Sequence, residues 1–359
     1  MDYYALDANA IREDPFLRRT PARLLLREAR HQRIGLLIPQ IAFDEAVNLH
    51  KQDLASARRK VDKGVRSLRR LGLDVASPTE AVDLDEASAS FAEELREIFL
   101  SSGGILLPYP QVDHAEVVRR ALDRCRPFDS GGKDGYRDTV LWETLCEAAT
   151  EYSPVILISA DRAAFSPNHS YELLAELREE LQARGLAADA IRRIPRIADF
   201  TDQLPRVDAI ELELEHMFAI PGDPRSIVVS TIEEEALDYD ESQTSVIGLN
   251  LEVDQLFIES VQEVSEIALI GAWPLEGDEN AFQLEARMVA TLELFIRKGD
   301  LYSHQGDEIT VIDADYNESF GIATICRVFS VQLDGTYDSS TKQLREIRTS
   351  SFTAVAPCD

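Results

Sequence analysis

Four acidic residues stand at positions where they could bind a metal ion together. Asp7 and Asp161 each end an apolar stretch that is typical of a buried strand, Glu45 lies on the first turns of an expected helix, and Asp138 opens another helix. In parallel sheets, sites form outside the carboxyl ends of the strands. Carboxylates that converge there repel one another, and a divalent cation with a preference for oxygen ligands, Mg²⁺ or Mn²⁺, relieves the repulsion. The residues alone leave this site a hypothesis, because acids after strands are common.

Such a cation can activate a water for attack on a phosphodiester and can neutralise the charge that develops there. No serine or cysteine has an evident base partner, so a protein nucleophile is not indicated. Simpler structural roles stay open, since Asp7 and Asp138 could each only cap a helix. Asp134, in the preceding glycine turn, could assist or replace Asp138. Asp44 and Glu45 are separated by about 100° of helix, so only one of them can face a given cleft.

Alternating strands and helices should position these acids. Apolar strands that alternate with helices favour a parallel sheet with helices on both faces. The expected strands are residues 3–7, 34–38, 155–161 and 196–200, and the expected helices include 20–31, a long helix from Pro39 to about Arg70, and 171–184. Residues from about 79 to 126 are predicted to form a helical insert around the break at Gly103 and Gly104.

Charge divides the chain near Arg206. Residues 1–206 carry 29 Lys and Arg against 34 Asp and Glu, whereas residues 207–359 carry 8 against 31, a formal charge of −23. We therefore expect two domains, 1–206 and 207–359. The second is predicted to be an acidic, antiparallel β-rich domain, a sandwich or an open barrel, that repels polyanions. Its expected strands are 226–232, 245–251, 286–296, 308–312, 321–331 and 348–355, with turns at 276–278 and 333–335.

The composition narrows the class of protein further. No apolar run approaches the roughly 18 residues of a membrane span, and the first residues do not resemble a signal peptide. The four cysteines show no Cys-x-x-Cys spacing, which disfavours a zinc site. A cytoplasmic protein with reduced thiols and no membrane partner is expected.

Four segments of the first domain together resemble the motifs of PIN-domain nucleases. Residues 5–9, Ala-Leu-Asp-Ala-Asn, are similar to the opening strand and Asp-x-Asn, and residues 38–45, Ile-Pro-Gln-Ile-Ala-Phe-Asp-Glu, to the strand–Pro–helix segment with its glutamate. Residues 133–142 resemble the Lys-x-x-x-x-Asp-x-x-x-Trp pattern of one PIN-like subgroup, and residues 158–165 resemble Ser-x-Asp-x-x-x-Phe. The order and approximate spacing match over about residues 1–200. The resemblance implies a PIN-like, Rossmann-like fold.

The resemblance also implies a chemistry and a set of residues. Asp7, Glu45, Asp138 and Asp161 would bind one or two Mg²⁺ or Mn²⁺ ions, and hydrolysis would leave a 5′-phosphate. Asn9, Thr139 and Ser159 would orient these acids through hydrogen bonds. From charge and position, nucleic-acid contacts are also expected from Lys133 and Arg137 beside Asp138 and from the helical row Arg59, Lys63, Arg66 and Arg70, with an ordinary solvated surface as the alternative for both groups.

We therefore expect a metal-dependent nuclease that acts on RNA, with DNA as the less favoured substrate. The acidic second domain would serve assembly or regulation, through a protein partner or a second copy. One alternative is a toxin or antiviral-defence effector whose nuclease is switched on by a partner, and another is a non-catalytic PIN-like scaffold. A haloacid-type phosphatase is disfavoured, because Asp7 begins Asp-Ala-Asn rather than Asp-x-Asp. The long insert and the second domain both depart from the small toxin-type members of the family.

Overall fold

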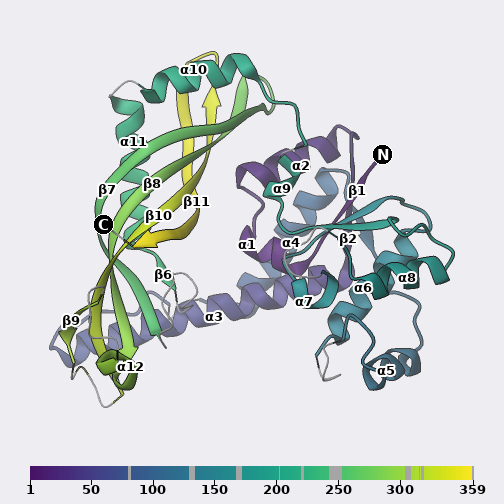
Figure 1. Cartoon of the computed structure of the whole chain (residues 1–359), viewed down its shortest axis with the longest axis horizontal. Coiled ribbons are helices and arrows are strands. Elements are labelled where there is room, and N and C mark those ends of the chain that lie inside the picture. The colour runs from purple at the N-terminus through teal and green to yellow at the C-terminus, as the bar shows by residue number, and fades with distance from the viewer. Residues whose placement is uncertain are drawn as a thin grey trace. The chain divides into compact units, whose positions relative to one another are not determined.

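The computed structural model contains two compact units, Met1–Gln203 and Leu204–Asp359 (Figure 1). It describes the chain except residues 80–81, 129–133, 167–171, 202, 220–221, 242–252, 304–308, 315, 317–318 and 358–359. Each unit has its own sheet and its own core, so each is described by itself.

A five-stranded sheet forms the centre of the first unit. Its strands are β1 (Tyr3–Leu6), β2 (Gly35–Pro39), β3 (Ile105–Leu107), β4 (Val155–Ile158) and β5 (Ile191–Ile194). The order is β3-β2-β1-β4-β5 and every pairing is parallel. β1 and β4 are neighbours and are almost wholly buried, which explains their unbroken apolar sequences. Their carboxyl ends therefore lie side by side, and Asp7 follows one of them.

Helices connect and cover these strands. They are α1 (Ala8–Glu13), α2 (Thr20–Arg30), α3 (Gln40–Arg70), α4 (Leu84–Ser101), α5 (His114–Leu122), α6 (Tyr136–Ala148), α7 (Arg162–Phe165), α8 (Ala175–Ala183) and α9 (Ala198–Thr201). Leu141 and Trp142 of α6 and Leu177 of α8 pack with Leu157 of β4 in one buried cluster. The ring of Phe200 in α9 meets Tyr4 of β1, with 4.9 Å between ring centroids. The expected α/β fold with a parallel sheet is thus confirmed.

Two local expectations for this unit differ from the structure. Residues 196–200 were expected to form the last strand, but they lead into the short helix α9, and the last strand is β5. Arg192 and Arg193 interrupt the apolar pattern of β5, so the sequence does not predict this strand. The insert contains α4 and α5, yet it also contributes β3, a three-residue edge strand beside β2.

One antiparallel sheet dominates the second unit. Its strands are β6 (Asp240–Glu241), β7 (Val253–Pro274), β8 (Glu279–Arg297), β9 (Thr310–Asp313), β10 (Phe320–Asp338) and β11 (Gln343–Pro357). The order is β11-β10-β8-β7-β6, and β9 pairs with β10. Alternate residues of β8 are buried. Leu214 and Phe218 of α10 (Asp208–Ala219) and Val228 and Ile232 of α11 (Asp223–Leu237) join the same core. A short helix, α12 (Lys298–Ser303), follows β8.

The expectation of a β-rich second domain is confirmed, with three local corrections. Residues 226–232 lie in the helix α11 rather than in a strand, and Pro224 in its first turn suits a helix start. The expected turn at 333–335 lies inside β10. Within the described part of the chain the sheet packs on helices, not on a second sheet as in a sandwich. The expected strand 245–251 falls outside the described residues.

The cysteines and the helices bear on two further expectations. Cys326 is in a disulfide, whereas Cys125 and Cys146 carry free thiols, so the prediction of reduced cysteines is wrong for Cys326. Among the described residues, none of the helices combines the length and apolar character that crossing a membrane requires.

Candidate functional site

Asp7 is fixed at the junction of β1 and α1. Its side chain is 6% exposed and caps α1, because Oδ1 accepts a hydrogen bond of 2.7 Å from the Ala8 backbone N–H. The Ser159 hydroxyl, just beyond β4, donates to Oδ2 at 2.7 Å. The expected alternative, a helix cap, is therefore real, but the same carboxylate is also tied to the end of the neighbouring strand.

Ser159 links Asp7 to Asp161. The Ser159 hydroxyl accepts a hydrogen bond of 3.1 Å from the Asp161 backbone N–H. Asp161 Oδ1 in turn accepts from the Ala164 N–H at 2.9 Å, in the first turn of α7. The buried hydroxyl thus holds two of the predicted acids at the edge of the sheet, which agrees with the orienting role expected for it.

Asp138 lies in the first turn of α6, which must start at a glycine. Gly135 has φ of +122°, and a Cβ there would lie 2.6 Å from the Phe128 Cα. The next residue after Asp138, Thr139, is fully buried, and its hydroxyl has no hydrogen-bond partner among the described residues. The buried side of α6 therefore fixes the helix against the sheet and leaves Asp138 at its positive N-terminal end.

Glu45 lies on the second turn of α3, where its carboxylate is paired with Arg137. Asp44 points elsewhere, because its two oxygens accept hydrogen bonds of 2.7 Å each from Gln40 and from the Tyr109 hydroxyl. This division supports the choice of Glu45 over Asp44 as the acid that faces the other carboxylates.

Electrostatics places the four acids in one neighbourhood. Burial, and to a lesser extent the charges of Asp161, Asp7 and Glu45, raise the pKa of Asp138 to about 7 against the opposing effect of Arg137. The pKa of Asp7 is raised to about 6, because burial and the charges of Glu45 and Asp161 outweigh the hydrogen bonds from Ser159 and Ala8 that lower it. Acids from four distant segments of the chain therefore lie close enough for their charges to influence one another.

Their present side-chain positions are not those of a metal site. Among the described residues, no three His, Cys, Asp or Glu side chains are close enough to hold a metal ion. The polar contacts explain this, since Glu45 is paired with Arg137 while Asp7 and Asp161 cap helices. The chemistry of the set still suits a hard divalent cation, because carboxylate oxygens are its ligands, and burial together with repulsion from the other acids raises the pKa of Asp138. The metal site stays a prediction.

Comparison with protein families decides the fold family of the first unit. Residues 5–165 match the model of the PIN domain. The first unit is a PIN-like domain. The match covers the elements from β1 to α7 and none of the second unit. No curated protein and no solved structure matches the chain.

The other residues predicted for the site of the PIN-like domain are scattered. Asn9 is exposed on α1 and makes no hydrogen bond to the four acids in the described part of the chain. Arg137 is beside Asp138 and is exposed. Lys133 lies outside the described residues. Arg59, Lys63, Arg66 and Arg70 are all exposed on the second half of α3, as their spacing predicts.

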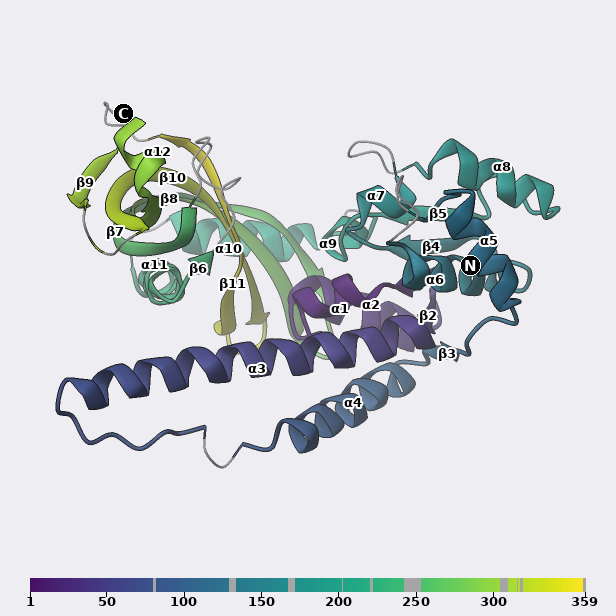
Figure 2. The same cartoon turned by 90° about the horizontal axis from the view of Figure 1, so that it is seen from below.

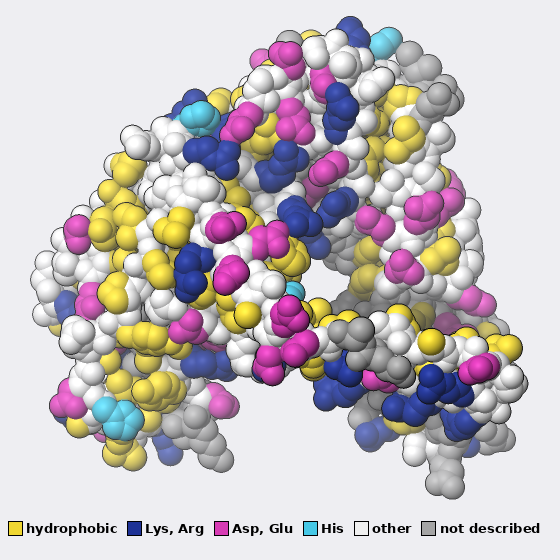
Figure 3. Space-filling model, turned by 180° about the vertical axis from the view of Figure 1, so that it is seen from behind, with side chains coloured by type: hydrophobic (Ala, Val, Ile, Leu, Met, Phe, Trp, Pro, Cys, Tyr) yellow, Lys and Arg dark blue, Asp and Glu magenta, His cyan; other side chains and the backbone are white. Residues whose placement is uncertain are grey.

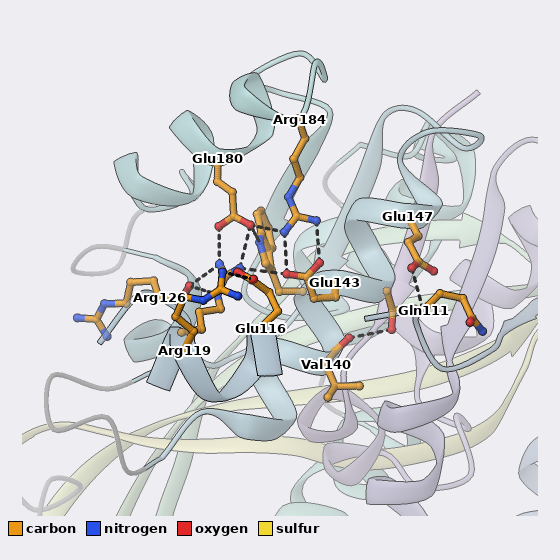
Figure 4. Close-up of polar contacts among 12 residues, drawn as sticks. Gln111, Glu116, Arg119, Arg126, Val140, Glu143, Glu147, Glu180 and Arg184 are labelled. Carbon is orange, nitrogen blue, oxygen red and sulfur yellow. Dashed lines mark hydrogen bonds and ion pairs between the residues drawn. The ribbon is translucent and has the colours of Figure 1, made fainter. Parts of the chain in front are cut away.

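Sequence reasoning missed a half-buried charge cluster behind α6 (Figure 4). Arg120 of α5 donates to Glu143 of α6 at 3.0 Å and to Glu180 of α8 at 2.9 Å. Arg184 of α8 donates to both oxygens of Glu143 at 2.7 Å. Trp142 Nε1 also donates to Glu180, at 3.2 Å. The one local signal was the four-residue spacing of Glu180 and Arg184. The cluster connects α6 with α5 and with the end of α8.

Proposed function

We propose that the PIN-like domain is a metal-dependent nuclease that hydrolyses phosphodiester bonds, with RNA as its substrate. PIN domains are usually nucleases, and this unit matches the family over residues 5–165. The observation that carries the proposal is the meeting of acids at the strand ends: Ser159 bridges Asp7 and the Asp161 backbone, and burial together with the charges of Asp161, Asp7 and Glu45 raises the pKa of Asp138. Carboxylates whose pKa values are raised by burial and by like charges cluster at functional sites.

Asp7, Glu45, Asp138 and Asp161 would hold Mg²⁺ or Mn²⁺. When bound, such an ion supplies a Lewis acid and an activated water. Ser159 keeps the Asp7 carboxylate in one orientation. Arg137 is exposed beside the acids, where its guanidinium can meet a phosphate.

The second unit is proposed to serve assembly or regulation. With 8 Lys and Arg against 31 Asp and Glu over residues 207–359, its charge disfavours binding of a polyanionic substrate. A protein partner or a second copy of the chain fits this charge better.

Metal removal tests the nuclease directly. The full chain is incubated with labelled single-stranded RNA or DNA in EDTA, Mg²⁺ or Mn²⁺. We expect cleavage of RNA in either metal and none in EDTA, because the four carboxylates alone carry no electrophile. Cleavage that continues in EDTA would refute metal dependence, and no cleavage of either polymer in any condition would favour a non-catalytic scaffold.

Arg137→Gln should strengthen Mn²⁺ binding by about two- to fivefold, the size expected for losing one exposed ion pair. Arg137 neutralises Glu45 and so competes with a cation for it. Calorimetric titration of Mn²⁺ into the metal-free protein measures the affinity without reference to activity. The matched control is Arg119→Gln, which also removes an exposed pair, with Glu116 on α5. Equal or weaker Mn²⁺ binding by the Arg137 variant would mean that Glu45 is not a ligand.

A further inference from the structure

The second half of α3 is strongly basic and projects from the α/β core as part of one long helix. We call residues 58–70 the α3 arm. It contains seven Lys and Arg against a single Asp, Asp62. Figure 2 shows α3 as one long helix with α4 beside its first half, and Figure 3 shows Lys and Arg side chains gathered at the lower right over the end of α3.

Core packing does not account for the α3 arm. The buried residues Ala42, Phe43 and Ala46 belong to the first turns of α3, and Val65 is the one buried residue described in the arm. The segment that follows α3, from Val75 to Val82, contacts the arm through hydrogen bonds. Ser77 and Thr79 donate to Asp62 at 2.9 and 2.6 Å. Two of the arm's cations, Arg58 and Arg69, donate to backbone carbonyls of this segment. These contacts hold one side of the arm.

The other side carries the row Arg59, Lys63, Arg66 and Arg70. All four are exposed, and none lies within ion-pair distance of a carboxylate among the described residues, although Arg66 interacts electrostatically with Asp62. Cations at three- and four-residue spacing repel one another, which is unfavourable for the helix unless an anion neutralises them. The row extends over about 16 Å of helix, the length of about five stacked nucleotides.

This row continues the face of α3 that carries Glu45. At about 100° per residue, the four cations lie within about 60° of the direction of Glu45 around the helix axis. Arg59 is 14 residues beyond Glu45 and Arg70 is 25, or about 21 and 38 Å along α3. A single-stranded nucleic acid that follows this face from Glu45 therefore reaches the first cation after about six nucleotides and the last after about eleven.

We propose that the α3 arm binds the phosphate backbone of single-stranded RNA and guides it along α3 toward Glu45. The inference rests on the proposed nuclease function and deepens it. Evenly spaced, flexible cations suit a repeating phosphate chain and give no sequence readout. The arm would thus set the length of RNA that binds well, while the acids set where it is cut.

The test measures binding to the full chain carrying Asp138→Asn, which keeps the RNA intact. Fluorescence anisotropy follows labelled oligo(U) of 4 to 12 nucleotides at several salt concentrations. Replacing Arg59, Lys63, Arg66 and Arg70 by Gln should weaken binding of the 12-mer by about 10- to 100-fold. It should also reduce the steepness of log affinity against log salt concentration by about 3, because each of the four lost phosphate contacts contributes about 0.7. The gain in affinity between 4 and 12 nucleotides should disappear.

The matched control exchanges the same residues for the other cation, Arg59→Lys, Lys63→Arg, Arg66→Lys and Arg70→Lys, and should keep the slope and the length dependence. Equal binding by the Gln variant would overturn the role of the arm while the nuclease proposal stands. Length-dependent binding through the arm by a chain that never cuts would instead overturn the nuclease and leave the arm as an RNA-binding surface. If the Gln variant loses self-association in sedimentation but not RNA binding, the arm contacts an acidic protein surface and the proposal is wrong.

Discussion

Asp138→Asn should reduce the turnover of RNA cleavage on the order of 10³-fold, the scale of losing one electrostatic group that the transition state requires. The side chain keeps its shape but loses its charge, and a neutral amide is a poorer ligand for a hard cation than a carboxylate. Asp138 is the acid whose pKa responds to all three of the others, so it is the centre of the cluster. Single-turnover cleavage in saturating Mn²⁺ measures the loss.

The same substitution should stabilise the metal-free protein at pH 8. The pKa of Asp138 is raised from 3.8 to about 7, so the native state binds this proton more tightly than the unfolded state. The contribution of Asp138 to the free energy of unfolding is therefore fully present below pH 4 and is lost as the pH rises through about 7. Asparagine removes the charge, and we expect about 1–3 kcal/mol of added stability at pH 8, with no gain near pH 4. Thermal unfolding in EDTA at both pH values measures it.

The matched control is Asp85→Asn, which removes an exposed acid of α4. It should leave both cleavage and the pH dependence of unfolding unchanged. A variant of Asp138 that is less active and more stable at pH 8 cannot owe its lost activity to misfolding. Full activity in that variant would remove Asp138 from the site and direct attention to Asp134.

The acids could be predicted from sequence because strand ends are local signals. The runs before Asp7 and Asp161 are apolar and short, and parallel pairing then brings their ends to one edge. The bridge through Ser159 and the pairing of Glu45 with Arg137 could not be derived from residue order, because both join segments far apart in the chain. The resemblance to PIN nucleases selected these four acids, which stay a prediction, and gave no indication that Arg137 pairs with Glu45.

The wrong secondary-structure predictions have a common physical origin, because tertiary packing overrides the local sequence pattern. Arg193 is 1% exposed in β5, so a charged residue occupies a position that pattern reading assigns to the surface. In α11 the run of β-branched residues at 227–229 is typical of a strand, but Val228 and Ile232 face one core at helical spacing. The turn read at 333–335 fails because Gly335 lies in β10, where a Cβ would meet the Phe282 ring at 2.3 Å.

Arg120→Met should destabilise the PIN-like domain by about 2–4 kcal/mol. Arg120 is 9% exposed, and it neutralises Glu143 and Glu180 while donating to the Arg126 carbonyl at 2.9 Å. Without Arg120, Arg184 is the one cation left in the cluster to neutralise Glu143 and Glu180. Removing one partner of a buried ion pair destabilises a protein strongly, because it leaves a buried charge without compensation. Urea unfolding should be followed by Trp142 fluorescence in a Trp273→Phe background, because Trp273 lies in the other unit and Trp142 touches Glu180.

Two further variants separate charge from packing at this cluster. Arg119→Met removes an exposed pair on the same helix and should cost less than about 0.5 kcal/mol. Adding Glu180→Met to Arg120→Met should recover part of the loss, since the unpaired carboxylate is then gone. Recovery would show that the cluster is a set of mutually neutralised charges behind α6, the helix that presents Asp138. No loss in Arg120→Met would mean that apolar packing alone holds α6 in place.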